Sequence, residues 1–241
     1  MKTIKFLSVL TITLAFGFLF NSCSKPDSEP SLPSYVPTNG LVGWYQFKGN
    51  TNDLSVNNLH GTNNGAVLTT DRNGITDAAY LFNDCNISIP NSESINFSQG
   101  YTFAAWVYMT EFAHTTILDK IDPDCSEYGF RINGRLNGTF WTEAGCYGGS
   151  NHTQTSIGVL LNTWHFVVGT YGPDKNLIIY QDGVLINTFA TEGWNLTNTE
   201  IIKIGSGHGA TYEPFKGKID DVGIWNRVLT QAEISSLFEA N

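Results

Sequence analysis

The chain closes with the stretch Phe215-Lys-Gly-Lys-Ile-Asp-Asp-Val-Gly-Ile-Trp-Asn-Arg-Val-Leu-Thr-Gln-Ala-Glu-Ile-Ser-Ser-Leu-Phe238, and this stretch decides the fold. Its first half, residues 217–226, predicts a β-strand that carries two adjacent carboxylates. Its second half predicts a short helix with Thr230 at the N-cap, because Glu233 can return a hydrogen bond to the cap amide. Leu229 and Ile234 have the spacing of a hydrophobic staple. A last strand followed by one capped amphipathic helix is a specific ending for a β-rich domain.

Further characteristic segments lie in order along the rest of the chain. They are Gly40-Leu-Val-Gly-Trp-Tyr-Gln-Phe47, Gly49-Asn-Thr-Asn-Asp-Leu-Ser55, residues 58–66, Tyr80-Leu-Phe82 with Ile87-Ser-Ile-Pro90, Thr102-Phe-Ala-Ala-Trp-Val107, Trp164-His-Phe-Val-Val-Gly-Thr170 and Tyr180-Gln-Asp-Gly-Val184. Together with the closing stretch, this order resembles the laminin-G-like jelly-roll domains of the concanavalin A-like lectin/glucanase superfamily, over residues 40–240. The resemblance implies an all-β fold, a two-sheet antiparallel jelly-roll sandwich with a short C-terminal helix.

The residue pattern also favours packed antiparallel sheets. Residues 101–108, 164–171 and 176–180 carry apolar side chains on both faces, as strands covered on both sides do. Asp182-Gly183 and Asn133-Gly134 each lie between two apolar runs, and both predict type I′ hairpin turns. We expect about a dozen strands, closed by packing two sheets face to face.

Residues 1–22 are typical of an export signal. Lys2 and Lys5 form a basic start, and the apolar run over residues 6–20 is shorter than a typical transmembrane helix. Ser22-Cys23 follows and resembles the lipobox of bacterial lipoproteins, in which the Cys is lipidated and becomes the N-terminus. The resemblance implies export and a lipid anchor at Cys23, in the bacterial outer membrane or at the cell surface. The alternative is an ordinary secretory signal with an incidental Cys.

A lipidated Cys and a Pro- and Ser-rich tether are expected over residues 23–37, and one laminin-G-like domain over residues 38–241. Asp27 and Glu29 in the tether resemble the acidic surface-export signal of Bacteroidetes lipoproteins. Without residues 1–22 the chain has 11 basic and 22 acidic side chains, a net charge of −11. Because no basic patch is present, nucleic acid is not an expected partner.

The four cysteines suggest one disulfide. Cys125 and Cys146 flank Asn133-Gly134 almost symmetrically, and two Cys at the mouth of one hairpin can pair in an exported protein. We therefore expect a Cys125–Cys146 disulfide, while pairing of Cys85 with either of them stays open. No CxxC or HxxxH spacing is present, so a zinc site is not expected.

The family resemblance implies a structural calcium ion. Relatives hold this ion between the loop after the first strand and an acidic residue of the closing strand, and the matching residues here are Asn50, Asp53 and Asp220. Carboxylate and amide oxygens are suitable ligands for calcium. Asp221 is expected to point to the opposite face of the strand from Asp220, so only one of the two is assigned as a ligand. The alternative is that these Asn and Asp residues form Asx-turns and bind nothing.

Catalysis is not expected. Laminarinase-type hydrolases of this superfamily carry Glu-x-Asp-x-x-Glu on one strand, which places nucleophile and acid about 5–5.5 Å apart. The sequence has no such run, and its acidic residues, among them Asp119, Glu127 and Glu143, are scattered. No catalytic residue is therefore predicted.

Binding is the remaining class of function. Trp141, Tyr147, His152 and Tyr212 lie in polar and aromatic segments between strands, where a sugar could stack on aromatic faces. The alternative is that these aromatic residues belong to the core. We expect a non-catalytic cell-surface module that binds an extracellular glycan. The alternatives are a protein-binding adhesion module, with other surface proteins as partners, and a glycoside hydrolase with an unrecognised active site.

Overall fold

The computed structural model describes residues 31–98, 100–121, 129–135, 138–145, 152–155, 158–193, 197–208 and 213–240. Within these ranges it has sixteen β-strands, one 3₁₀ turn at Glu93–Ile95 and one α-helix. The all-β prediction is confirmed. Residues 1–30, with the predicted export signal and Cys23, lie outside the described ranges.

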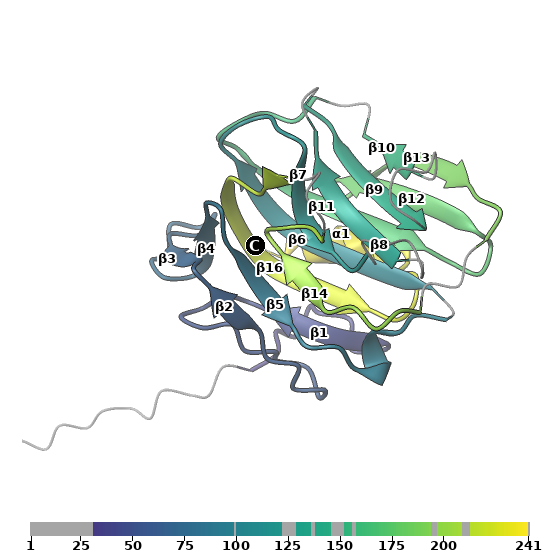
Figure 1. Cartoon of the computed structure of the whole chain (residues 1–241), viewed down its shortest axis with the longest axis horizontal. Helices are drawn as coiled ribbons and strands as arrows, with labels where there is room; N and C mark the ends of the chain where they lie inside the picture. The colour runs from purple at the N-terminus through teal and green to yellow at the C-terminus, as the bar shows by residue number, and fades with distance from the viewer. Residues whose placement is uncertain are drawn as a thin grey trace, which may run out of the picture. The chain divides into compact units, whose positions relative to one another are not determined.

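The strands form two sheets that pack face to face (Figure 1). Sheet A has the order β13 (Val184–Ala190), β12 (Asn176–Gln181), β11 (Trp164–Tyr171), β6 (Tyr101–Met109), β16 (Gly217–Trp225), β4 (Ala79–Phe82) and β3 (Val67–Thr69), with β1 (Leu41–Tyr45) also paired to β16. Sheet B has the order β10 (His152–Gln154), β9 (Phe140–Gly145), β8 (Gly129–Gly134), β7 (Thr115–Asp119), β14 (Ile202–Ile204), β5 (Asn86–Ile89) and β2 (Thr62–Asn64), with β15 (Glu213–Pro214) parallel to β7.

The main core fills the space between the sheets. Phe103 and Val107 of β6 meet Ile132 of β8 and Ile204 of β14 in one cluster of buried side chains. The alternate residues of β6, Ala104 and Trp106, belong to a second cluster on the other face of sheet A. Strand β6 is therefore covered on both sides, as its sequence predicts.

The C-terminal helix covers this second face of sheet A. Helix α1 (Gln231–Glu239) buries Ile234 and Leu237 in the cluster that contains Trp106, and Phe238 stacks on Trp106 with ring centroids 5.6 Å apart. The predicted capping box is present, since Thr230 and Glu233 exchange hydrogen bonds at the helix start. The closing stretch therefore forms a strand and a capped helix, as predicted.

The compact unit begins earlier than residue 38. Residues from Ser31 belong to it, although the sequence places the tether up to residue 37. Val36 is only 3% exposed, and the indole Nε1 of Trp225 donates to the carbonyl of Pro37 at 2.7 Å. Tyr35 packs edge-on against Trp44. The end of the expected tether is thus part of the domain.

One of the two predicted hairpin turns is confirmed and the other is wrong. Asp182 and Gly183 have φ angles of 51° and 77° and connect β12 to β13 directly, as a type I′ turn requires. Asn133 and Gly134 instead lie inside β8, and the chain reverses between Gly134 and Phe140, which are paired. Gly138, with φ of 68°, is the glycine that the real turn uses.

No helix in the described part of the chain is both long and apolar enough to cross a membrane.

Candidate functional site

A row of polar side chains crosses the outer face of sheet B. Directly opposed residues on its seven neighbouring strands are Thr62, Ser88, Lys203, Asp119, Arg131, Glu143 and His152. We call these seven residues the polar row. Opposed residues in a sheet share one face, and their neighbours along the strands, such as Ile132 and Ile204, belong to the core. The polar row therefore faces away from the core.

Arg131 lies at the centre of the row between two carboxylates. Its Nε is 3.7 Å from Oδ1 of Asp119 and 3.8 Å from Oε2 of Glu143, and none of the three side chains is more than 5% exposed. Asp119 also accepts hydrogen bonds from the amides of Ile121 and His208, at 2.8 and 2.7 Å. Buried charges are tolerated only when they are paired and hydrogen-bonded. The centre of the row is accordingly a fixed polar array.

His208 adds a titratable group beside this centre. Its Nδ1 is 3.7 Å from Oδ2 of Asp119, and its Nε2 is 3.4 Å from Oε2 of Glu200. The imidazole is 6% exposed. It lies in the segment that follows β14.

An aromatic stack lies at the β9–β10 end of the row. The rings of Trp141 and His152 are nearly parallel, with centroids 3.8 Å apart and an interplanar angle of 11°. The guanidinium carbon of Arg135 lies 3.6 Å from the centroid of the Trp141 ring. The His152 ring and the Arg135 guanidinium are both too close to Trp141 to share one face of its ring, so they cover opposite faces.

The structure thus brings together two of the four residues predicted to bind a ligand. Trp141 and His152 are stacked, whereas Tyr147 and Tyr212 lie outside the described residues. The Asp119–Arg131–Glu143 set is not apparent from the sequence, because these residues are scattered along the chain. Only the pairing of three strands makes them neighbours, and the misplaced turn at Asn133-Gly134 hid the pairing of Arg131 with Glu143.

Asp53 has its carboxylate filled by internal donors. Its Oδ1 accepts from the amides of Trp44 and Ser55, and its Oδ2 accepts from the amide of Leu59 and the hydroxyl of Ser55, at 2.7–3.0 Å. Asn50 accepts from the amide of Asn52 at 2.9 Å, which is an Asx-turn. These local hydrogen bonds are the ones expected if the Asn and Asp residues form turns and bind no calcium.

Asp220, the third predicted calcium ligand, pairs with an arginine. Arg72 makes two ion pairs of 2.6 Å, one to Asp220 and one to Asp221, and its guanidinium lies 4.7 Å from the centroid of Trp106. The expectation that Asp220 and Asp221 point to opposite faces is wrong. Asp221 has φ of 43° and the register of β16 with β6 is irregular there, so both carboxylates reach Arg72.

The predicted calcium ligands therefore do not fit a calcium site in this arrangement, because Asp53 and Asp220 already bind N–H donors. Among the described residues, no group of three or more His, Cys, Asp or Glu side chains is placed to hold a metal ion. Calcium binding stays a prediction of the family resemblance.

Cys85 carries a free thiol and is buried. Cys125 and Cys146 lie outside the described residues, so their disulfide stays a prediction. The disulfide is expected because Cys125 and Cys146 flank Asn133-Gly134 almost symmetrically. Asn133-Gly134 is not the turn of this hairpin.

Solved structures with the same fold include domains from bacterial toxins and from a glycosidase. The binding domain of Paraclostridial Mosquitocidal Protein 1 matches with a TM-score of 0.71 and 19% identity, over 84% of this chain and 52% of that one. Botulinum neurotoxin type C, which depends upon interaction with two ganglioside molecules for entering cells, matches with a TM-score of 0.65 and 18% identity, over 84% and 51%. This chain thus spans about half the length of those toxin structures.

A third match covers nearly the whole of the other chain. Domain 4 of AbnA, a GH43 extracellular arabinanase from Geobacillus stearothermophilus, was solved in complex with arabinotriose. It matches with a TM-score of 0.65 and 19% identity, over 83% of this chain and 98% of that one.

No match was found among curated proteins. A family model does match, over residues 83–235, which is more than half of the chain. The matched part runs from strand β5 to helix α1, and so contains the centre of the polar row and the Trp141–His152 stack. The chain therefore belongs to the Laminin_G_3 family of the concanavalin A-like lectin/glucanases superfamily.

Proposed function

We propose that this protein is a non-catalytic module that binds an extracellular carbohydrate on the outer face of sheet B. The observation that carries the proposal is the stack of Trp141, His152 and Arg135 at the β9–β10 end of the polar row. The buried centre of the row, Asp119, Arg131 and Glu143, fixes the strands that carry this stack. Sites for small polar ligands combine a few fixed polar groups with aromatic surface. The match to an entire arabinanase domain solved with arabinotriose supports this ligand class.

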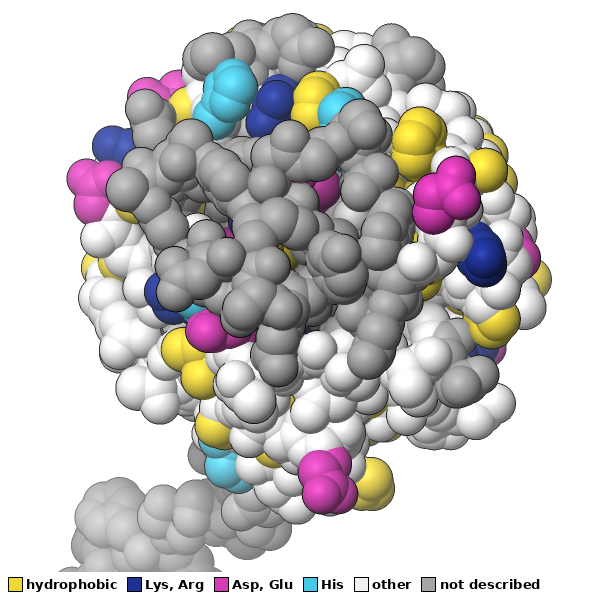
Figure 2. Space-filling view, turned by 45° about the vertical axis from the view of Figure 1, so that its right-hand side comes forward, with side chains coloured by type: hydrophobic (Ala, Val, Ile, Leu, Met, Phe, Trp, Pro, Cys, Tyr) yellow, Lys and Arg dark blue, Asp and Glu magenta, His cyan; other side chains and the backbone are white. Residues whose placement is uncertain are grey.

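The described side chains on the face that Figure 2 shows also favour a polar ligand. In Figure 2 the hydrophobic side chains of the described residues form separate spots, with charged side chains of both signs between them. Protein-docking faces more often carry a contiguous apolar patch. A protein-binding adhesion role is therefore the second reading.

The carboxylates of the row favour binding over hydrolysis. A glycosidase needs one protonated carboxyl group and a second carboxylate, both facing the sugar bond. Asp119 and Glu143 instead each face Arg131 and are almost fully buried. Neither is placed to act as a general acid.

Lipid anchoring through Cys23 and display at the cell surface belong to the same proposal. They are supported by the basic and apolar start of the chain and by Ser22-Cys23. Changing Cys23 to Ala should move the protein from the membrane fraction to the soluble fraction. A Cys23→Ala protein that stays in the membrane with residues 1–22 intact would contradict the lipid anchor.

The binding test is retention on polysaccharides in affinity gels, using the chain without residues 1–22. We expect retention on at least one glycan, no release of sugar, and loss of retention in a His152→Ala variant. Trp164→Ala is the matched control, because this half-buried aromatic residue lies on sheet A. Sugar release would contradict the non-catalytic role. Absence of retention on every glycan, with a protein partner recovered by crosslinking, would favour the adhesion role.

A further inference from the structure

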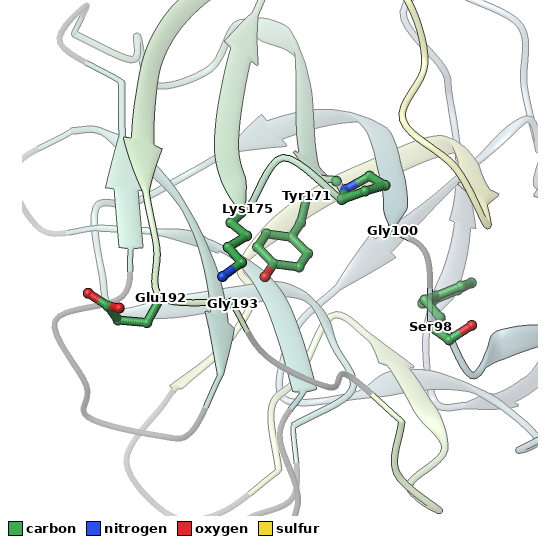
Figure 3. A pocket seen from close by; sticks show the side chains of 9 residues that line it. Ser98, Gly100, Tyr171, Lys175, Glu192 and Gly193 are labelled. Carbon is green, nitrogen blue, oxygen red and sulfur yellow. The ribbon is translucent and has the colours of Figure 1, made fainter.

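A cavity of about 280 Å³ lies at one end of sheet A and shares no residue with the polar row. Its walls come from the residues before β6, the end of β11, the turn between β11 and β12, and the residues after β13 (Figure 3). The edges of Phe97 and Tyr171, which are only 2% and 5% exposed, form its floor. The exposed residues Lys175 and Glu192 supply the charges.

The backbone holds Lys175 in a fixed and unusual conformation. Its φ is 61°, in the left-handed region that few residues other than glycine adopt. Its amide donates to the carbonyl of Gly172, and its carbonyl accepts from both the amide and the hydroxyl of Thr191, each at 2.9 Å. The turn between β11 and β12 enforces this conformation, since the bond from Lys175 to Gly172 closes the turn.

A glycine contact guides the side chain of Lys175. A Cβ atom at Gly193, whose φ is 93°, would lie 2.9 Å from Cε of Lys175. The lysine side chain therefore runs close over this glycine. The backbone therefore fixes where this exposed side chain starts, and Gly193 leaves room for it to pass.

Among the described residues, the ammonium group of Lys175 makes no ion pair. Lys216, by contrast, pairs with Asp84. The adjacent Asp174 is engaged elsewhere, because it accepts hydrogen bonds from the amide and side chain of Asn176. In Figure 3 the side chains of Lys175 and Tyr171 extend in the same direction, while the carboxylate of Glu192 points away from both.

We propose that this cavity binds the carboxylate-bearing sugar of an acidic glycan, with Nζ of Lys175 on the carboxylate and the sugar over the floor of the cavity. Its ligand class rests on the proposed carbohydrate function. Sites for drug-sized ligands start at about 300 Å³, so the volume suits one sugar ring. One compact ammonium matches the single charge of a carboxylate. A phosphate, with a charge of about −1.5 to −2, would need a second cation, and Lys175 is the one cationic residue in the lining of this cavity.

The test titrates the chain without residues 1–22 with galacturonate and with neutral methyl galactoside, by calorimetry or by chemical shifts. We expect galacturonate to bind more tightly than the neutral sugar, and less tightly as salt is added. Lys175→Gln should weaken galacturonate about tenfold, which is about 1.4 kcal/mol. Glu192→Gln should strengthen it, because a like charge is removed. Lys216→Gln, which removes a positive charge outside the cavity, should leave it unchanged.

Opposite effects of the Lys175 and Glu192 variants are the signature of this cavity. Equal binding of galacturonate by the parent protein and Lys175→Gln, with both folded by circular dichroism, would overturn the proposal. Loss of galacturonate binding in His152→Ala alone would place the acidic sugar on sheet B, which overturns the cavity and leaves the proposed function standing. Absence of galacturonate binding alongside retention on neutral polysaccharides would have the same meaning. If the parent protein binds no glycan at all, both the cavity proposal and the proposed carbohydrate function are overturned.

Discussion

Arg72 reaches from the loop after β3 to the two adjacent carboxylates of β16. One guanidinium here faces two buried acids, so the cluster has an excess of negative charge. Burial raises the pKa of Asp220 and the neighbouring Asp221 raises it further, against the opposing effect of Arg72, to about 8. Burial likewise raises the pKa of Asp221. The cluster therefore favours a bound proton.

This shift predicts how stability depends on pH. The folded protein holds a proton on Asp220 that the unfolded chain, with a pKa of 3.8, releases. The contribution to stability is complete below that unfolded value and is lost as pH rises through about 8. We expect the free energy of unfolding in urea to fall between pH 5 and pH 9, and Asp220→Asn to reduce this slope. A slope that is the same in both proteins would contradict the assignment.

Asp53 provides a test of calcium binding. Calcium held by Asn50, Asp53 and Asp220 would make a chelator lower the melting temperature. Because internal donors fill Asp53 and Asp220, we expect neither chelator nor added calcium to change it. Asp53→Ala should still cost at least about 2 kcal/mol, since it leaves three amides without their acceptor.

The control for this prediction is Asn50→Ala, which removes one exposed Asx-turn and should change stability by less than about 0.5 kcal/mol. A melting temperature that calcium raises in the parent protein but not in Asp53→Ala would restore the calcium site.

Single elements differ in how well the sequence predicts them, and the reason is where their information lies. The capped helix and the Asp182-Gly183 turn depend on residues close in sequence, and both predictions are confirmed. Asn133-Gly134 has the same local signal as a turn. The side-chain amide of Asn133 is instead buried and donates to the carboxylate of Glu143 on the next strand, at 3.4 Å. This pairing between strands overrides the local preference for a turn.

The capping box predicts the result of a small substitution. Thr230 accepts from the amide of Glu233, and the carboxylate of Glu233 accepts from the amide of Thr230. Thr230→Ala removes the first bond and should lower the free energy of unfolding by roughly 1 kcal/mol. Thr230→Ser keeps a hydroxyl acceptor and should lie close to the parent protein in the same urea titration. Equal losses in both variants would show that the side-chain bond contributes nothing.

For the whole molecule, the fold was more predictable than the site. Ordered strand motifs are enough for a sandwich, because each strand only has to bury its apolar face. The polar row depends on the registers of seven strands at once, and a shift of one residue in any of them would break it. Trp141 and His152 could be chosen from the sequence, because they lie in polar and aromatic segments between predicted strands. Arg131 could not, since a buried arginine is defined only by the carboxylates that other strands bring to it.

The outer faces of the two sheets differ in what covers them. Sheet A is covered by α1 and by the segment from Ser31 to Pro37, while sheet B carries the polar row. A protein that starts at Thr38 loses the buried side chain of Val36 and the hydrogen bond from Trp225 to Pro37. Burying a Val contributes about 1.5–3 kcal/mol and a hydrogen bond about 1 kcal/mol.

We accordingly expect the protein that starts at Thr38 to be less stable than one that starts at Ser31 by about 2 kcal/mol or more in urea unfolding. Val36→Ala in the longer protein should give a smaller loss in the same direction. Retention on a glycan should stay the same in all three, because the removed segment packs on sheet A and the polar row lies on sheet B. Equal stability of the two lengths would put the domain boundary at residue 38. Lost glycan retention in a folded shorter protein would mean that the face of sheet A contributes to binding.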